Sequence, residues 1–306
     1  MQRARRSVFV AAQYLLAIAI IWYAVRSLRG QWALAGDRIA QLHPEWSWII
    51  AATLIVLATY LLLVETWRRV IIASGERLSF YDAARIWFVS NLGKYVPGKI
   101  WSIAAMTMMA RERKVSPVTA AGSSVLMQLV SIASGIGVVL VTGASAVDHP
   151  GIAIAAAIAI LGGLFTIPFL LPSLARGLSG VTGKEMSIPQ LRSSTVWMAV
   201  FASIISWISY GMAFQFFVRG VIGNAAGATT SYIAVYAASY IIGFLALFAP
   251  GGAVVRESAM VTGMLRLGLT GRPDALVIAV ASRLWLTVTE LLPGLAWMAA
   301  GKRSTD

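Results

Sequence analysis

The sequence predicts an all-α integral membrane protein with about six spanning helices and two re-entrant helical hairpins that form an inverted repeat. Three observations carry this prediction. Hydrophobic residues make up 58% of the 306 residues and charged residues 12%, which is about half the charged share of a soluble domain. Six stretches are long and apolar enough to span a bilayer, and two further apolar regions are broken by Pro-Gly sequences at matching places.

The composition also excludes several function classes. So few charged residues cannot cover the surface of a soluble enzyme, and the net charge of +13 on so apolar a chain is typical of membrane orientation rather than nucleic-acid binding. The chain has no cysteine, and its two histidines, His43 and His149, lie far apart in polar loops. We therefore expect neither a metal site nor a cofactor.

The predicted spans cover roughly residues 8–25, 47–67, 118–142, 150–172, 195–218 and 275–299. The first follows a basic N-terminal segment. Because Trp22, Tyr23 and Arg26 stand at its end instead of a small-residue cleavage site, we interpret it as a retained span rather than a signal peptide. The polar gaps are too short to hold a folded domain, so we expect a single transmembrane domain over residues 1–306.

The two interrupted regions, about 79–114 and about 229–267, predict re-entrant hairpins. Pro97-Gly98 breaks the first, and Pro250-Gly251-Gly252 breaks the second. Proline removes a backbone donor and glycine permits a sharp reversal. After the first break, about 13 residues precede Arg111. They make roughly 20 Å of helix, which is too short for a hydrocarbon core of about 30 Å.

Both regions follow one order: an apolar helix, a Pro-Gly tip, a short helix, a basic residue, and a proline turn that opens a full span. The proline turns are Ser116-Pro117 and Arg272-Pro273. Three spans separate the hairpins, and an odd number of crossings places them on opposite faces of the membrane. This is the inverted repeat typical of transporters.

Basic residues outside the spans predict the orientation. With the N-terminus inside, the inner segments hold 14 Lys and Arg residues and the outer segments hold 6. The positive-inside rule then places both termini in the cytoplasm, with the first hairpin entering from the cytoplasm and the second from outside. The outer set is Arg26, Arg29, Arg38, Arg219, Arg266 and Arg272; the inner set is Arg3, Arg5, Arg6, Arg68, Arg69, Arg77, Arg111, Arg113, Lys114, Arg176, Lys184, Arg192, Lys302 and Arg303.

The candidate functional residues are ionisable groups at membrane depth and the hairpin tips beside them. A charge at the centre of a span costs about 2.5–3.5 kcal/mol, so such residues pair, line water or face a charged ligand. Four of the six are basic and two acidic, which leaves a net charge of +2 and predicts an anion site. These six are Lys94, Lys99, Arg256, Glu257, Arg283 and Glu290.

The tips strengthen this prediction, because a helix N-terminus offers free N–H groups and glycine lets a phosphate approach the backbone. We expect the two tips to meet near the midplane and cradle a lipid phosphate. In the alternative interpretation, Lys94 and Lys99 reach the interface, and Arg256–Glu257 and Arg283–Glu290 are structural ion pairs. The expected substrate-binding set is Lys94, Tyr95, Pro97, Gly98, Lys99, Pro250, Gly251, Gly252, Arg256, Glu257, Arg283 and Glu290.

The segments 91–101 (NLGKYVPGKIW) and 250–257 (PGGAVVRE) resemble the two signature hairpins of the lysylphosphatidylglycerol synthase transmembrane family, also called flippase-like. Arg283 also fits its pattern, and the resemblance covers essentially the whole chain. It implies a lipid translocator of the inner (plasma) membrane. Two departures matter. Val254 stands where the family commonly has a glycine, and the aminoacyl-transferase domain of the bacterial resistance factors has no counterpart, so we expect no lipid-charging activity.

Together these features predict a translocator, not an enzyme, that binds the anionic headgroup of a phospholipid or of a polyprenyl-phosphate-linked sugar. No nucleotide motif occurs, so transport is passive or coupled to an ion, with Glu257 and Glu290 as candidate proton carriers. One alternative is an accessory protein that regulates a membrane glycosyltransferase in cell-envelope polysaccharide assembly. Another is a membrane enzyme acting on a lipid phosphate, for which no His, Cys or nearby acid pair supplies a base.

The orientation is testable because the chain contains no native cysteine. We expect a Glu112→Cys variant to resist a membrane-impermeant thiol reagent in intact cells and to react after permeabilisation, because this segment is basic and cytoplasmic. A cysteine in the outer segment 219–228 is the positive control. Labelling of position 112 from outside would contradict the hairpin.

Overall fold

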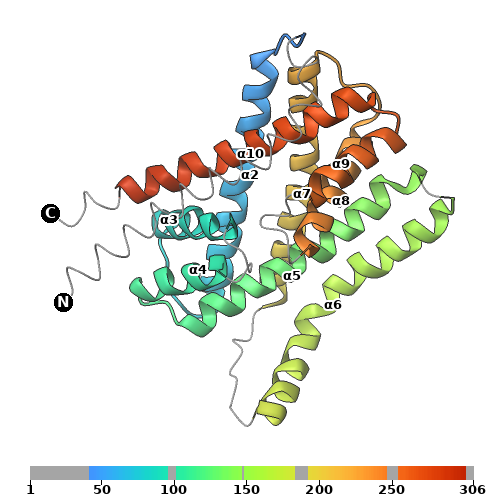
Figure 1. Cartoon of the computed structure of the whole chain (residues 1–306). Helices are drawn as coiled ribbons and strands as arrows, with labels where there is room; N and C mark the ends of the chain where they lie inside the picture. The colour runs from blue at the N-terminus through green and yellow to red at the C-terminus, as the bar shows by residue number, and fades with distance from the viewer. Residues whose placement is uncertain (1–40, 96–100, 147, 183–191, 247–253, 301–306) are drawn as a thin grey trace.

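A computed structural model describes residues 41–95, 101–146, 148–182, 192–246 and 254–300 (Figure 1). No strand occurs in these ranges, so the all-α prediction is confirmed. The described α-helices are α2 (Trp46–Ala73), α3 (Phe80–Asn91), α4 (Trp101–Glu112), α5 (Pro117–Thr142), α6 (Pro150–Thr182), α7 (Ser193–Ile222), α8 (Thr229–Leu245), α9 (Val255–Arg266) and α10 (Arg272–Ala300), with 3-10 turns η1 (Leu92–Tyr95) and η2 (Ala144–Ala146).

Five of these helices are long and apolar enough to cross a membrane: α2, α5, α6, α7 and α10. They coincide with five of the six predicted spans. The first predicted span, 8–25, lies outside the described residues. Each spanning helix exposes large apolar side chains, as lipid-facing helices require, with Leu54 on α2 60% exposed and Ile158 on α6 67% exposed.

The hairpin helices are short. Helices α3, α4 and α9 have 12 residues each, about 18 Å at 1.5 Å per residue, and α8 has 17. Helix α3 packs on α4, and α8 packs on α9. In hairpin one (α3–α4), the Arg113 guanidinium lies 3.1 Å from the Asp82 carboxylate, so an ion pair joins the two helix ends opposite the tip. The tips themselves, within 96–100 and 247–253, lie outside the described residues.

The helix packing shows the predicted repeat. Repeat one (α2–α5) and repeat two (α7–α10) each contain a long helix, a hairpin and a second long helix. The helix contacts in one have counterparts in the other: α2 with α3 as α7 with α8, and α4 with α5 as α9 with α10. Each hairpin also packs against the other repeat: α3 contacts α10, and α8 contacts α5. The predicted repeat is therefore present in three dimensions.

The two hairpins lie at opposite ends of α5, as Figure 1 shows. Helix α4 follows the first half of α5, where the Ser124 hydroxyl donates to Met106 Sδ at 2.9 Å. Helix α8 follows the second half, where a Cβ added at Gly143 would lie 3.4 Å from Ala234 Cβ. Repeat two reproduces the first contact, since the Ser282 hydroxyl donates to Met260 Sδ at 3.5 Å.

Glycines set the closest helix approaches inside this bundle. Gly135 on α5 faces the indole of Trp207 on α7, and a Cβ there would lie 2.7 Å from Trp207 Cε2. That indole cannot move freely, because its N–H donates to the Ser131 carbonyl at 2.8 Å. Small residues allow this approach where apolar side chains have no hydrophobic driving force to associate.

We predict that Gly135→Ala destabilises the protein by about 1–3 kcal/mol, because the added methyl overlaps a hydrogen-bonded indole. The measurement is thermal unfolding in detergent. Gly162→Ala on α6 is the matched control, since a Cβ there meets nothing within 4 Å. Equal melting temperatures for the two variants would contradict the packing at Gly135.

Candidate functional site

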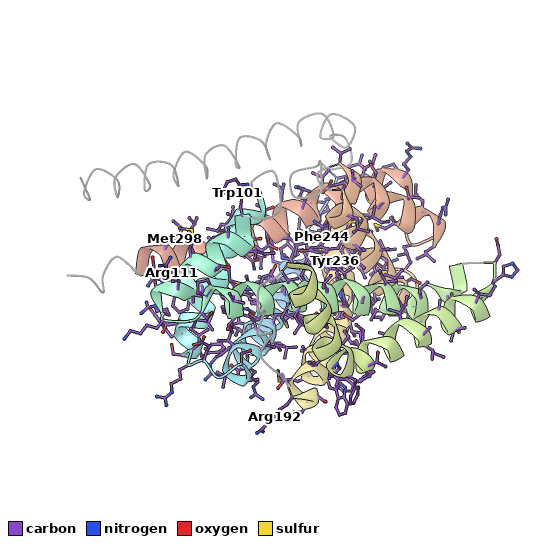
Figure 2. The ribbon with its side chains drawn as sticks, turned by 90° about the horizontal axis from the view of Figure 1, so that it is seen from below. Trp101, Arg111, Arg192, Tyr236, Phe244 and Met298 are labelled. Carbon is purple, nitrogen blue, oxygen red and sulfur yellow. The ribbon has the colours of Figure 1, made fainter. Side chains whose placement is uncertain are left out.

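A cavity of about 290 Å³ lies between the two repeats. Every described helix of both repeats contributes to its wall, and the peripheral α6 does not. Figure 2 shows two lining residues, Tyr236 and Phe244 on α8, toward the middle of the molecule, while Arg111, Arg192 and Met298 lie toward its margins. The cavity is therefore central in the bundle and shared between the halves of the inverted repeat.

Arg256 is the most unusual residue in this wall. It is the second residue of α9 and only 7% exposed. Its guanidinium carbon lies 5.8 Å from the centre of the Tyr236 ring and 6.0 Å from that of Tyr240. Gly243 on α8 makes room for the side chain, because a Cβ there would lie 2.7 Å from Arg256 Cβ. Two aromatic rings and one glycine thus hold a cation at the edge of the cavity.

The charge of Arg256 is not compensated by a described carboxylate. Its Nε and Nη2 atoms are buried and have no hydrogen-bond partner among the described residues. The residue also lies at a helix N-terminus, where the macrodipole favours anions and disfavours cations. A buried arginine in this setting concentrates positive potential at the cavity, which suits an incoming anion.

Glu257, the next residue on α9, is bonded elsewhere. Its Oε1 accepts from Nη1 of Arg283 on α10 at 2.7 Å, with 7% and 11% of the two side chains exposed. The sequence-based alternative paired Glu257 with Arg256, whereas the structure pairs it with Arg283. Sequence spacing within one helix could not reveal it, because the partner of Glu257 comes from another helix.

Glu290 holds a separate position in the same cavity. The Tyr60 hydroxyl on α2 donates to its Oε1 at 2.8 Å, which links repeat one to repeat two. Tyr60 also packs edge-on against Tyr210 of α7, with ring centres 6.0 Å apart. The Glu290 carboxylate therefore accepts a hydrogen bond from a phenol of the other repeat.

The structure brings together part of the expected binding set. Arg256, Arg283 and Glu290 line the cavity, and Glu257 supports it through Arg283. The backbone of Lys94 and Tyr95 forms the end of η1. The side chains of those two residues lie outside the described part of the chain, as do Pro97, Gly98, Lys99, Pro250, Gly251 and Gly252. In the described ranges, no cluster of three or more His, Asp or Glu side chains is arranged to hold a metal ion.

Val254, the residue that departs from the family pattern, has a distinctive backbone. It precedes α9 with φ of +70° and ψ of −45°, in the half of conformational space that favours glycine. A β-branched residue there costs roughly 1–3 kcal/mol of local strain. The glycine that the family commonly has at this position would adopt the same conformation without that cost.

Sequence reasoning missed the uncharged part of the cavity wall. Ser203, Trp207 and Tyr210 on α7 and Tyr236 and Tyr240 on α8 all line it. They recur at spacings of three or four residues, so each set forms a polar and aromatic stripe on one face of an apolar helix. That periodicity was the available signal. Trp87 on α3 also lines the cavity.

Residues 10–294 match the family described as Lysylphosphatidylglycerol synthase TM region. No curated protein matches the chain in sequence.

The ion pair between Glu257 and Arg283 yields a stability prediction. We expect Glu257→Gln to destabilise the protein by about 3–5 kcal/mol, because it leaves a buried arginine without its carboxylate. Glu65→Gln is the control, since Glu65 pairs with Arg68 and Arg69 at the more exposed end of α2 and its loss costs about 0–1 kcal/mol. Thermal unfolding in detergent compares the two, and an equal loss of stability would contradict a buried pair.

Proposed function

The chain belongs to the lysylphosphatidylglycerol synthase TM region family, a family of multi-pass membrane proteins named for lipid metabolism, and from this premise we propose that it is a lipid translocator. Its cavity binds the anionic headgroup of a membrane lipid, either a phospholipid or a polyprenyl-phosphate-linked sugar, and passes it between leaflets. The proposal places the chain in the plasma membrane with both termini in the cytoplasm, and it involves no chemical step on the lipid.

The observation that carries this proposal is that Arg256 is buried and has no carboxylate partner in the part of the chain that the structure describes. Removing a cation from water without a counter-charge is costly, so a buried arginine of this kind is retained where a ligand supplies the negative charge. A lipid phosphate is an anion that can reach this depth of a bilayer, because its acyl chains stay in the hydrocarbon. Arginine can also bind two phosphate oxygens at once.

The position of the cavity supports movement rather than static binding. It lies where the two inverted repeats meet, and both hairpins contribute to its wall. In transporters with inverted repeats, one repeat rocks against the other around a fixed central site. A headgroup held there becomes accessible first from one side and then from the other.

We predict that Arg256→Gln nearly abolishes translocation of fluorescent phosphatidylglycerol in proteoliposomes, measured by quenching of the outer leaflet. Arg256→Lys should keep partial activity, because it retains the charge but loses the two-pronged geometry. Both variants should unfold near the wild-type temperature, since Arg256 forms no ion pair with a described residue.

Two outcomes would contradict this proposal. A stable Arg256→Gln protein that moves lipid normally would remove the cavity from the transport mechanism. A purified wild-type chain that moves neither phosphatidylglycerol nor a polyprenyl-phosphate sugar would favour the accessory role, in which the protein regulates a membrane glycosyltransferase instead.

A further inference from the structure

The two repeats contribute different chemistry to the cavity. From repeat two come the charged residues Arg256, Arg283 and Glu290. Repeat one contributes no described charged side chain to the wall, but it supplies Asn91, Ser102 and Gln128. The described charged side chains of the wall therefore all come from repeat two, whereas uncharged hydrogen-bonding groups come from both repeats.

The repeat itself makes this difference visible. Counting back from the end of the second hairpin helix, Ser102 lies ten residues before Glu112, as Arg256 lies ten residues before Arg266. An uncharged hydroxyl in hairpin one thus stands where hairpin two has its buried arginine. At this position the cavity-facing side chains do not follow the repeat of the backbone, which suits a ligand whose two ends differ.

Asn91 and Gln128 are the informative residues of the uncharged wall. Gln128 lies in the middle of the apolar span α5, and Asn91 ends α3; both are half-buried. Neither carboxamide has a hydrogen-bond partner within the described ranges. An amide that opens onto a cavity can both donate to and accept from a ligand. Two of them on one cavity wall are therefore suited to a ligand with hydrogen-bonding groups.

We infer that Gln128 and Asn91 determine headgroup specificity by binding an uncharged, hydroxyl-bearing group attached to the phosphate. A carboxamide offers both a donor and an acceptor, which matches a hydroxyl. The phosphate lies against Arg256, and the hydroxylated group lies against repeat one. A glycerol headgroup and a sugar share this chemistry. The inference rests on the proposed anion site and adds the identity of the group beside the anion.

Three probes separate the sources of this chemistry. Short-chain phosphatidylglycerol carries a glycerol hydroxyl group, citronellyl phosphoglucose carries a sugar, and short-chain phosphatidic acid carries the phosphate alone. We expect the wild-type protein in detergent to bind at least one hydroxylated probe at least tenfold more tightly than phosphatidic acid, by calorimetric titration. Equal affinity for all three would overturn the inference.

The variant that tests the residue is Gln128→Met, which preserves side-chain length and removes the amide. It should weaken binding of the preferred hydroxylated probe about tenfold, or about 1.4 kcal/mol, and leave phosphatidic acid binding unchanged. Gln215→Met is the matched control, because Gln215 is a half-buried amide on α7 that does not line the cavity. The control should bind all probes as the wild type does.

The failures are distinguishable. If Gln128→Met weakens phosphatidic acid as much as the hydroxylated probes, or changes neither, the specificity role is wrong while the anion site stands. Arg256→Gln should weaken all three probes. If it weakens none of them, the proposed function itself fails. Asn91→Leu provides a second variant with the same expected selectivity loss, should Gln128→Met not fold.

Discussion

An uncompensated charge is costly in a low-dielectric membrane interior. The partner of one carboxylate, Glu257, therefore decides which of two neighbouring arginines has its charge compensated within the protein. Glu257 is adjacent to Arg256 in sequence, yet it binds Arg283 from α10 at 2.7 Å. This contact joins hairpin two to the last spanning helix and satisfies one of two buried arginines. The other, Arg256, has no described carboxylate, and the ligand chemistry proposed for the cavity follows from that division of charge.

The architecture that positions these residues depends on close packing rather than on buried charge. Gly243 admits the stem of Arg256 against α8, and Gly135 admits the Trp207 indole against α5. Between the repeats, α2 and α7 form the most extensive helix pair, closed at one end where the Glu45 N–H donates to the Gly220 carbonyl at 2.8 Å. In lipid, where apolar side chains gain little by associating, such small-residue contacts and backbone hydrogen bonds stabilise the helix packing.

The inverted repeat explains why the cavity is central, and the departures from symmetry explain how its walls differ. Paired Ser–Met contacts at Ser124 and Ser282 show the backbone symmetry in detail. The charged side chains are distributed unequally, because the described ones in the cavity wall belong to repeat two. A repeated backbone that carries different side chains in its two halves suits a headgroup with two chemically different parts. In the proposed roles, Arg256 binds the phosphate and Gln128 binds the hydroxyl-bearing group.

The sequence by itself determined the helical class, five of the spans now seen, the two hairpins and their repetition. These follow from hydropathy, Pro-Gly breaks and helix length, which are local properties that a bilayer enforces strictly. It also identified Arg256, Arg283 and Glu290 as candidate functional residues, because a charge at membrane depth is costly whatever the tertiary structure. Only the tertiary structure decided the partners. Glu257 binds Arg283, Tyr60 binds Glu290, and Gln128 lines the cavity that repeat two also lines. Each of these relations joins helices that are far apart in sequence. The periodicity of residues within one helix does not encode which other helix it will contact.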